Sequence, residues 1–282
     1  MNSSLVRYLP GTTPLVLDSP HSGTTYPPDF RFACDLSLLR TAEDTHVERL
    51  YDFAPGLGVA WIEALFPRSY LDVNRHPQEI DVEMLDGPWP GEQPDSATLA
   101  KVRLGKGLVW RCTDDGVPIY DRKLSVAEVQ SRIERCWKPY HAHVAEAMDA
   151  AHARHGYAIH INCHSMPAVA GSHATDFPGL AHADFVVGDR DGSTAKAALS
   201  QLVCDHLRGL GYSVDYNHPY KGVELVRRHG DPARERHSLQ LEVNRKLYMD
   251  ERTLATHDGF EPLRASLRSL VEKLLSVDPR SL

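Results

Sequence analysis

The chain has 282 residues, with 38 acidic and 31 basic side chains and a net charge of −7 when histidine is neutral. An acidic surface does not attract polyphosphate, so the charge argues against nucleic acid as a partner. With 42% hydrophobic and 24% charged residues, the composition is that of an ordinary soluble globular protein, which excludes the disordered and fibrous classes.

No segment approaches the roughly 18 uncharged apolar residues that a membrane span needs, and the N-terminal MNSSLVRYLP lacks a long apolar core. We therefore expect a cytoplasmic protein that does not enter a membrane. The cysteines are odd in number, scattered and without a C-x-x-C pair, which predicts reduced thiols: Cys34, Cys112, Cys136, Cys163 and Cys204.

Short apolar runs alternate with helical patterns along the chain, which favours an α/β fold. The expected strands are 14–18, 59–64, 157–163, 184–188, 212–216 and 238–243. A helix is predicted to begin at Ser125, because Glu128 completes a capping box, and Pro139 should kink or divide it. Leucines at helical spacing between Leu263 and Leu274 predict a C-terminal amphipathic helix that docks on the sheet.

No linker, repeat or block of like charge separates domains, so we predict a single domain over residues 1–282. The segment 86–106 contains the Pro- and Gly-rich GPWPGEQPDS. At this length such a stretch is typical of an excursion from the fold and not of a boundary.

The first candidate for chemistry is His21, in DSPHSG directly after the apolar run PLVLD. Ligands of open α/β sheets bind at the carboxyl ends of strands, so a histidine at this junction is well placed to bind a metal. The alternative is a turn histidine whose ring caps a backbone carbonyl.

An acidic patch, EDTHVE, follows at 43–48 on a predicted helix that begins at Leu36. If this helix is continuous, Glu43 falls inside its apolar stripe, while Asp44 and Glu48 flank the stripe. Zinc commonly takes two histidines and a carboxylate, so one of these acids is a candidate third ligand.

Two arginines, Arg68 and Arg75, stand in PRSYLDVNR at 67–75. A guanidinium binds a carboxylate through two parallel hydrogen bonds, so the pair in an acidic protein predicts an anionic substrate. Surface ion pairing is the alternative for either arginine. The H-x-x-E spacing of His143 and Glu146 lies mid-helix among other histidines, and we interpret it as part of a solvated face.

Two expected strands carry polar side chains on one face. In YAIHINCHSMP, alternation places Cys163 on the apolar face and His164 on the polar face near the strand end, so the two cannot form a nucleophile and base pair. In SLQLEVNR the polar face carries Gln240, Glu242 and Asn244. A carboxylate on a buried strand is costly unless it is paired or used; an edge strand with one wet face is the alternative.

The sequence contains no H-E-x-x-H, G-x-S-x-G or P-loop motif and no G-x-G-x-x-G after a strand, so nucleotide and flavin chemistry have no support. Instead, the blocks described above together resemble the N-formylglutamate amidohydrolase family, related to zinc carboxypeptidases and aspartoacylases. The resemblance spans nearly the whole chain: SPHSGTTYP at 19–27, EDTHVERLY at 43–51, FPRSYLDVNR at 66–75, INCHSMP at 161–167, DFVVGDRDG at 184–192, NHPYKGVELVRRHG at 217–230 and LQLEVNRKLYMDE at 239–251.

The resemblance implies a mixed central β-sheet flanked by helices, a zinc-carboxypeptidase-like three-layer sandwich, that holds one zinc per chain. It implies that His21, His164 and one carboxylate from EDTHVE are the metal ligands. We choose Asp44 as this carboxylate. The amphipathic pattern favours Glu43 instead, and Glu48 remains a third alternative. The short H-x-x-E that such relatives use after the first strand is absent here.

The resemblance further implies Glu242 as general base and a substrate clamp made of Asn74 and Arg75, aided by Arg68 or Arg245. The expected activity is zinc-dependent hydrolysis of N-formyl-L-glutamate to formate and glutamate, as in histidine degradation. The substrate would be a small anionic acyl amino acid. Two alternatives remain: a deacylase for another N-acyl amino acid, and a metal-free binding homologue without activity.

Overall fold

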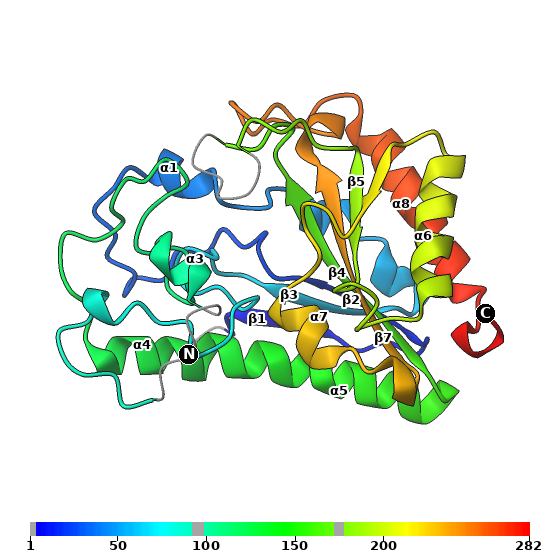
Figure 1. The fold of residues 1–282 in the computed structure, drawn as a ribbon, viewed down its shortest axis with the longest axis horizontal. Helices are drawn as coiled ribbons and strands as arrows, with labels where there is room; N and C mark the ends of the chain where they lie inside the picture. The colour runs from blue at the N-terminus through cyan, green and yellow to red at the C-terminus, as the bar shows by residue number, and fades with distance from the viewer. Residues whose placement is uncertain (1–3, 92–98, 172–177) are drawn as a thin grey trace.

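A mixed seven-stranded β-sheet forms the centre of the computed structural model, which describes residues 4–91, 99–171 and 178–282 (Figure 1). The strand order is β1-β3-β2-β4-β7-β5-β6. β1 and β5 run antiparallel to β3 and β7, and the other pairs are parallel. The strands are β1 Val6–Leu9, β2 Leu15–Ser19, β3 Ala60–Ala64, β4 Ala158–Met166, β5 Phe185–Gly188, β6 Val214–Tyr216 and β7 Arg236–Asn244.

All six predicted strands are confirmed, and no end differs by more than three residues. Alternation along β4 is also as expected: Ile159, Ile161 and Cys163 belong to one hydrophobic cluster, and the polar side chains between them point to the other face. The edge strand β1 was not predicted, because its four residues, VRYL, are too few to show a period.

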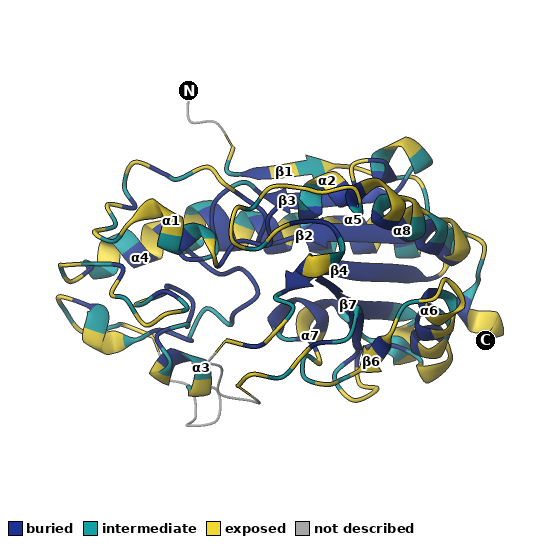
Figure 2. Cartoon of the chain, turned by 90° about the horizontal axis from the view of Figure 1, so that it is seen from above, coloured by how far each residue is buried: buried dark blue, intermediate teal, exposed yellow. Residues whose placement is uncertain are grey.

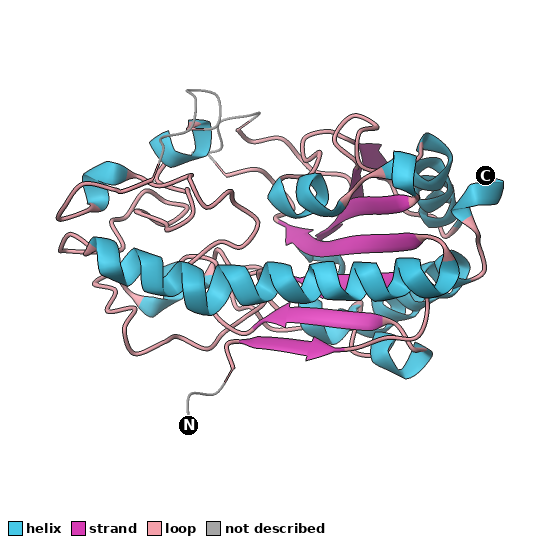
Figure 3. Cartoon of the chain, turned by 90° about the horizontal axis from the view of Figure 1, so that it is seen from below, coloured by secondary structure: helices cyan, strands magenta, loops and turns pink. Residues whose placement is uncertain are grey.

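Helices cover both faces of the sheet, which confirms the predicted three-layer α/β architecture. One hydrophobic cluster lies under α2 Val47–Leu50, α6 Ala197–Gly209 and α8 Phe260–Leu275. A second cluster lies under α4 Val126–Arg132, α5 Lys138–His155 and α7 Glu224–His229. α5 runs across its face of the sheet (Figure 3). The inner strands are buried between the two layers, whereas the edge strands β1 and β6 are partly exposed (Figure 2).

The helix that begins after Ser125 has the predicted capping box, in which Ser125 Oγ accepts from the Glu128 N–H and the Glu128 carboxylate accepts from the Ser125 N–H. A π-helical turn, Ile133–Trp137, separates α4 from α5 directly before Pro139. The chain remains helical through this turn, so the predicted effect of Pro139 takes the form of a local π-helical interruption and not of a break. α8 also confirms its prediction, with Leu263, Leu267, Leu270 and Leu274 buried against the sheet.

The continuous helix expected from Leu36 through the EDTHVE block is wrong. The chain instead forms α1 Leu36–Arg40, a turn, and α2. His46 adopts a left-handed conformation with φ of 69°, and the Asp44 N–H donates to the His21 carbonyl at 3.0 Å rather than to its own helix. The amphipathic argument for Glu43 therefore loses its basis.

The carboxyl ends of β2, β4 and β7 face a loop-rich half of the molecule (Figure 3). This half includes α1, α3 Ala100–Arg103 and part of the 86–106 segment, of which residues 92–98 lie outside the described residues. Short 3₁₀ turns occur at Ala54–Leu57, Val82–Met84, Pro232–Arg234, Arg245–Leu247 and Pro279–Ser281. Over the described residues, no helix is both long and apolar enough to cross a membrane.

Candidate active site

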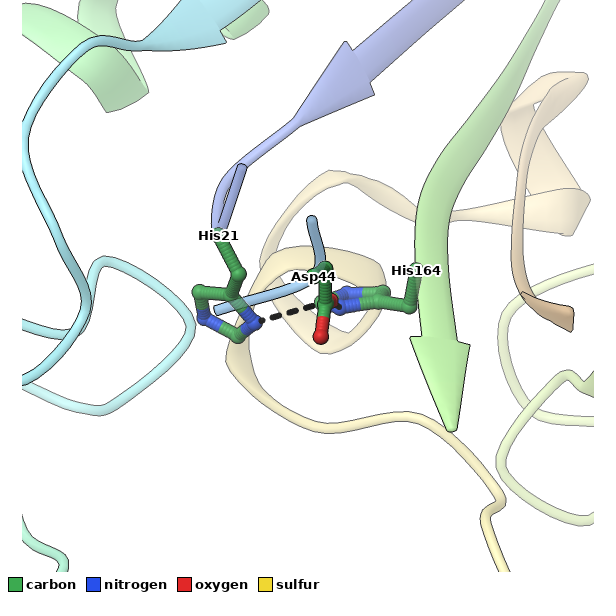
Figure 4. Close-up of side chains that lie close together, drawn as sticks. All are labelled: His21, Asp44 and His164. Atoms are coloured by element: carbon green, nitrogen blue, oxygen red, sulfur yellow. Dashed lines mark hydrogen bonds and ion pairs between the residues drawn. The ribbon is translucent and has the colours of Figure 1, made fainter. Parts of the chain in front are cut away.

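His21, Asp44 and His164 meet at the carboxyl edge of the sheet (Figure 4). His21 follows β2, His164 lies near the end of β4, and Asp44 stands in the turn between α1 and α2. β2 and β4 are parallel neighbours, so their ends meet although the two histidines are far apart in sequence. One potential ligand atom from each of the three residues lies within 4.8 Å of the others, and all three side chains are buried. The predicted convergence is confirmed.

The ring of His21 is fixed by a buried carboxylate. Its Nε2 lies 2.7 Å from Asp72 Oδ1, so Nε2 carries the proton that Asp72 accepts. Its Nδ1 has no hydrogen-bond partner among the described residues and lies 3.6 Å from Asp44 Oδ2. A buried nitrogen lone pair is thereby directed toward Asp44 and His164.

His164 is oriented in the same way by an amide. Its Nε2 lies 2.7 Å from Asn162 Oδ1, and Asn162 Nδ2 donates to Asp18 Oδ1 at 2.8 Å. Asp18 therefore fixes which end of the Asn162 amide faces the histidine. The other ring nitrogen, Nδ1, lies 3.0 Å from Asp44 Oδ2.

The electrostatics keep Asp44 ionised. Burial by itself would raise the pKa of the Asp44 carboxyl, but its contacts with His164 and His21 hold this pKa well below the usual range. Arg245 Nη2 donates to Asp44 Oδ1 at 3.1 Å and leaves Oδ2 facing the histidines. Two imidazole nitrogens and one carboxylate oxygen are a donor set that fits a divalent metal such as zinc, and each histidine has an outer hydrogen-bond partner of the kind that metal ligands use.

The other two acids of the EDTHVE block do not join this cluster. Glu43 accepts from the Tyr26 hydroxyl at 2.6 Å and from Arg40. Burial raises the pKa of Glu48 to about 7, aided by the nearby Glu63 and opposed by a hydrogen bond to its own backbone N–H. Of the three candidates, only Asp44 is placed to share a metal with both histidines.

Glu242 lies beside this cluster on β7. Its Cα is paired in register with that of His164, and β7 lies between β4 and β5, so the alternative of an edge strand is wrong. The residue is 7% exposed. Burial raises the pKa of the Glu242 carboxyl to about 7, whereas the nearby His164 lowers it and Asp44 raises it. A buried carboxyl with a pKa near neutrality is suited to proton transfer.

Both the histidine cluster and Glu242 line a cavity of about 880 Å³, and so do the four side chains predicted to bind substrate: Arg68, Asn74, Arg75 and Arg245. Their hydrogen bonds distinguish them. Arg75 is 8% exposed, its guanidinium makes no hydrogen bond to a described protein group, and its Nε lies 3.9 Å from Asp72 Oδ2. It is therefore available for an anionic ligand.

The other two arginines are largely engaged within the protein. Arg68 donates through Nε and Nη2 to Asp72 Oδ2, at 3.2 and 2.9 Å. Arg245 donates to Ser165 Oγ, to Asp44 and to two backbone carbonyls. Arg245 thus positions Asp44, and its role in binding substrate stays a prediction.

Asn74 uses its amide oxygen to accept the Leu225 N–H at 2.9 Å, and its Nδ2 lies 3.3 Å from His164 Nε2. Its substrate role also stays a prediction. The H-x-x-E pair, His143 and Glu146, lies on α5 and not in this cluster. The His143 ring stacks on Tyr8 with centroids 4.7 Å apart, and His143 Nδ1 lies 3.5 Å from Glu146 Oε2.

Sequence reasoning missed the roles of Asp72, Asn162 and Asp18. Asp72 lies within the block FPRSYLDVNR and Asn162 within INCHSMP, so both motifs contained the residues. What the sequence did not show is which histidine each would meet, because Asp72 is 51 positions from its partner.

The fold and the site define a class: an α/β protein in which a buried His–Asp–His cluster and an arginine without a hydrogen-bonded acceptor line one cavity. The model of the N-formylglutamate amidohydrolase family matches residues 13–249. N-formylglutamate deformylases from Pseudomonas aeruginosa and Pseudomonas putida are 31% and 30% identical to this chain, over 94% of both chains in each case.

A crystal structure of N-formylglutamate amidohydrolase from Ralstonia eutropha JMP134 superposes with a TM-score of 0.92 at 44% identity, covering 99% of this chain and 100% of that one. A gene product of Agrobacterium tumefaciens, 18% identical with a TM-score of 0.63, shares the fold. The chain belongs to the N-formylglutamate amidohydrolase family.

Proposed function

We propose that this chain hydrolyses N-formyl-L-glutamate to formate and L-glutamate with the help of one zinc ion. The observation that carries the proposal is one cavity that is lined by the His–Asp–His cluster, by Glu242 and by Arg75, whose guanidinium makes no hydrogen bond to a described protein group. The relatives named N-formylglutamate deformylase support the same substrate.

His21 Nδ1, His164 Nδ1 and an oxygen of Asp44 would hold the metal. When bound, zinc supplies Lewis acidity toward the formyl carbonyl and toward an attacking water. Asp72 and Asn162 keep the protons of the two imidazoles on Nε2, so that both Nδ1 lone pairs stay available.

Glu242 serves as the general base and then as the acid. Its carboxylate takes a proton from the water whose oxygen adds to the formyl carbon, and it returns that proton to the nitrogen as the C–N bond breaks. This transfer matters because an amine expelled without a proton is a poor leaving group. The products, formate and the glutamate amine, account for all atoms of substrate and water.

Arg75 binds a carboxylate of the substrate. A buried guanidinium that has an anion only at 3.9 Å and no hydrogen-bonded acceptor gains most from a ligand that satisfies it, and a carboxylate accepts two of its parallel N–H groups. Binding at a point remote from the reacting carbon also positions that carbon. Asp72 contacts both Arg68 and His21. Burial by itself would raise the pKa of Asp72, but Arg68 and His21 lower it well below its usual range, so Asp72 stays ionised and can accept the His21 proton.

A formate-release assay on purified protein with a panel of formyl-, acetyl- and succinyl-amino acids tests the proposal, together with elemental analysis for zinc. We expect N-formyl-L-glutamate to give the highest kcat/KM and the metal content to approach one zinc per chain. A preference for another acyl group would favour the alternative deacylase, and no turnover with any substrate would favour an inactive binding homologue.

We place this activity in the cytoplasm, in a route such as histidine degradation that yields formylglutamate. The proposed partner is this small anionic substrate, with neither a nucleic acid nor a membrane involved. The negative charge of the chain supports this proposal.

A further inference from the structure

Gln240 is a buried polar residue of the cavity that the reaction described above does not use. It lies on β7 two residues before Glu242, and alternation places both side chains on the same face of the sheet. The residue is 3% exposed and lines the cavity with Glu242, His164 and Arg75.

The orientation of the Gln240 amide follows from its neighbour. Gln240 Nε2 donates to Glu242 Oε1 at 2.9 Å. In the ionised state that a general base requires, the Glu242 carboxylate only accepts hydrogen bonds, so the NH₂ end of the amide faces it and the carbonyl end faces away. Gln240 Oε1 is buried and has no hydrogen-bond partner among the described residues.

A buried acceptor without a donor destabilises a protein, and such atoms are rare unless a ligand or a water satisfies them. Two of the donors that line the cavity, Arg68 and Arg245, are directed at Asp72 and Asp44, and an ionised N-formylglutamate offers its amide N–H as a hydrogen-bond donor. The group that Gln240 Oε1 can take from a substrate is a neutral N–H.

We infer that Gln240 determines specificity for amides: Gln240 Oε1 accepts the N–H of the scissile formamide, while Gln240 Nε2 holds Glu242. The inference rests on the proposed function and deepens it. Glu242 must reach the nitrogen of the leaving amine, and Gln240 is hydrogen-bonded to Glu242 and lines the same cavity. We therefore place the N–H of that nitrogen beside Gln240 Oε1.

An ester has an oxygen with lone pairs where an amide has its N–H. Gln240 Oε1 therefore stabilises the amide and repels the ester, and a site built to pair a polar group rejects an analogue that lacks it. Loss of the contact between Gln240 Nε2 and Glu242 would disturb the acid that protonates the leaving nitrogen, which the amide needs more than the ester does. The role of Oε1 is therefore isolated by comparison with a variant that lacks this contact but keeps an acceptor oxygen.

The test compares N-formyl-L-glutamate with the O-formyl ester of 2-hydroxyglutarate, which carries the same two carboxylates. Formate release gives kcat/KM for both substrates after subtraction of the uncatalysed rate. In Gln240→Met, which keeps the length of the side chain but has no acceptor amide, we expect the amide-to-ester ratio to fall about tenfold relative to the wild type.

Two further variants complete the design. Gln240→Glu keeps an oxygen at the Oε1 position, so its ratio should stay within about threefold of the wild type although the added charge beside Glu242 lowers both rates. Gln201→Met makes the same chemical change on the exposed face of α6 and should alter neither rate. Zinc content and Tm show whether each variant is folded and loaded.

The outcomes are separable. If the wild type releases formate from the amide and the ratio is unchanged in Gln240→Met, Gln240 Oε1 does not contact the substrate and the inference is wrong, whether a water or nothing satisfies that atom. If Gln240→Met does not fold, a tenfold loss of ratio in Gln240→Glu would equally overturn it. If the wild type releases no formate, the proposed function itself fails.

Discussion

Two pairs of buried histidines in the described part of the chain have different surroundings. His21 and His164 have ring centroids 4.7 Å apart, and both contact Asp44. His141 and His229 have centroids 5.4 Å apart, with Nδ1 of the first 3.2 Å from Nε2 of the second. The second pair has no carboxylate within ion-pair distance among the described residues, and His141 Nε2 donates to the Val73 carbonyl.

The pKa values follow from this difference. Burial lowers the pKa of His141 to about 4, against smaller opposing contributions from Val73 and Glu224. Burial also lowers the pKa of His229 well below its usual value, and the neighbouring His160 and His141 lower it further. This pair stays neutral and supports packing. A carboxylate between two imidazoles is what turns buried histidines into a site for a cation.

The largest expected effect comes from breaking the first pair. His21→Ala and His164→Ala should each lose bound zinc and activity together, because a site that lacks one of three ligands holds metal poorly. Elemental analysis of the purified variants and formate release measure both properties. His143→Ala, which changes the histidine of the H-x-x-E pair on α5, is the matched control and should keep both bound zinc and activity. If either His21→Ala or His164→Ala kept stoichiometric zinc, the histidine replaced in that variant would not be a zinc ligand.

Glu242→Gln tests the chemistry beside the first pair. The amide cannot take up a proton, so turnover should fall by about 10²–10⁴-fold while zinc is retained. Glu251→Gln, at another part of the cavity wall, is the control for the loss of one negative charge. Near-normal turnover in a folded, metal-loaded Glu242→Gln would place the base elsewhere.

Low pH should destabilise the folded protein through the second pair, His141 and His229. Between about pH 6.5 and pH 4 the unfolded chain binds a proton at His141 that the folded protein does not bind. The free energy of unfolding therefore falls as the pH falls through this range. Above pH 6.5 His141 does not change it. The expected loss for His141 is about 3 kcal/mol.

Urea unfolding of the wild type and of His141→Gln across this range measures the effect. The variant should show a flatter acid limb, whereas His143→Gln, two positions along the same helix and half-buried, should follow the wild type. Parallel curves for the wild type and His141→Gln would mean that His141 does not remain neutral in the folded protein.

The smallest of these effects concerns the substrate clamp. Arg75→Lys replaces two parallel donors by one compact charge, so kcat/KM for N-formylglutamate should fall about 10–100-fold, in line with roughly 1.5–3 kcal/mol for a charged hydrogen bond. A formylated glutamine ester, without either carboxylate, serves as the comparison substrate and should change far less. If kcat/KM fell equally for both substrates, Arg75 would support the fold or the metal centre and would not bind the substrate carboxylate.

Much of this architecture could be predicted from local patterns. Period-two alternation placed Cys163 in the core and His164 on the functional face, and the capping box fixed the start of the helix after Ser125. These features depend on residues within a few positions of one another, so a single sequence displays them. The motif blocks likewise identified the family.

Tertiary structure decided which of these residues meet. The selection of Asp44 over Glu43 required the chain to leave the helix and donate the Asp44 N–H to the His21 carbonyl. The pairing of His21 with Asp72, the engagement of Arg245 within the protein and the unpaired Oε1 of Gln240 likewise depend on contacts between segments far apart in sequence or on the orientation of one amide. Periodicity carries no record of such contacts, because they arise only when parallel strands bring their carboxyl ends to one edge of the sheet.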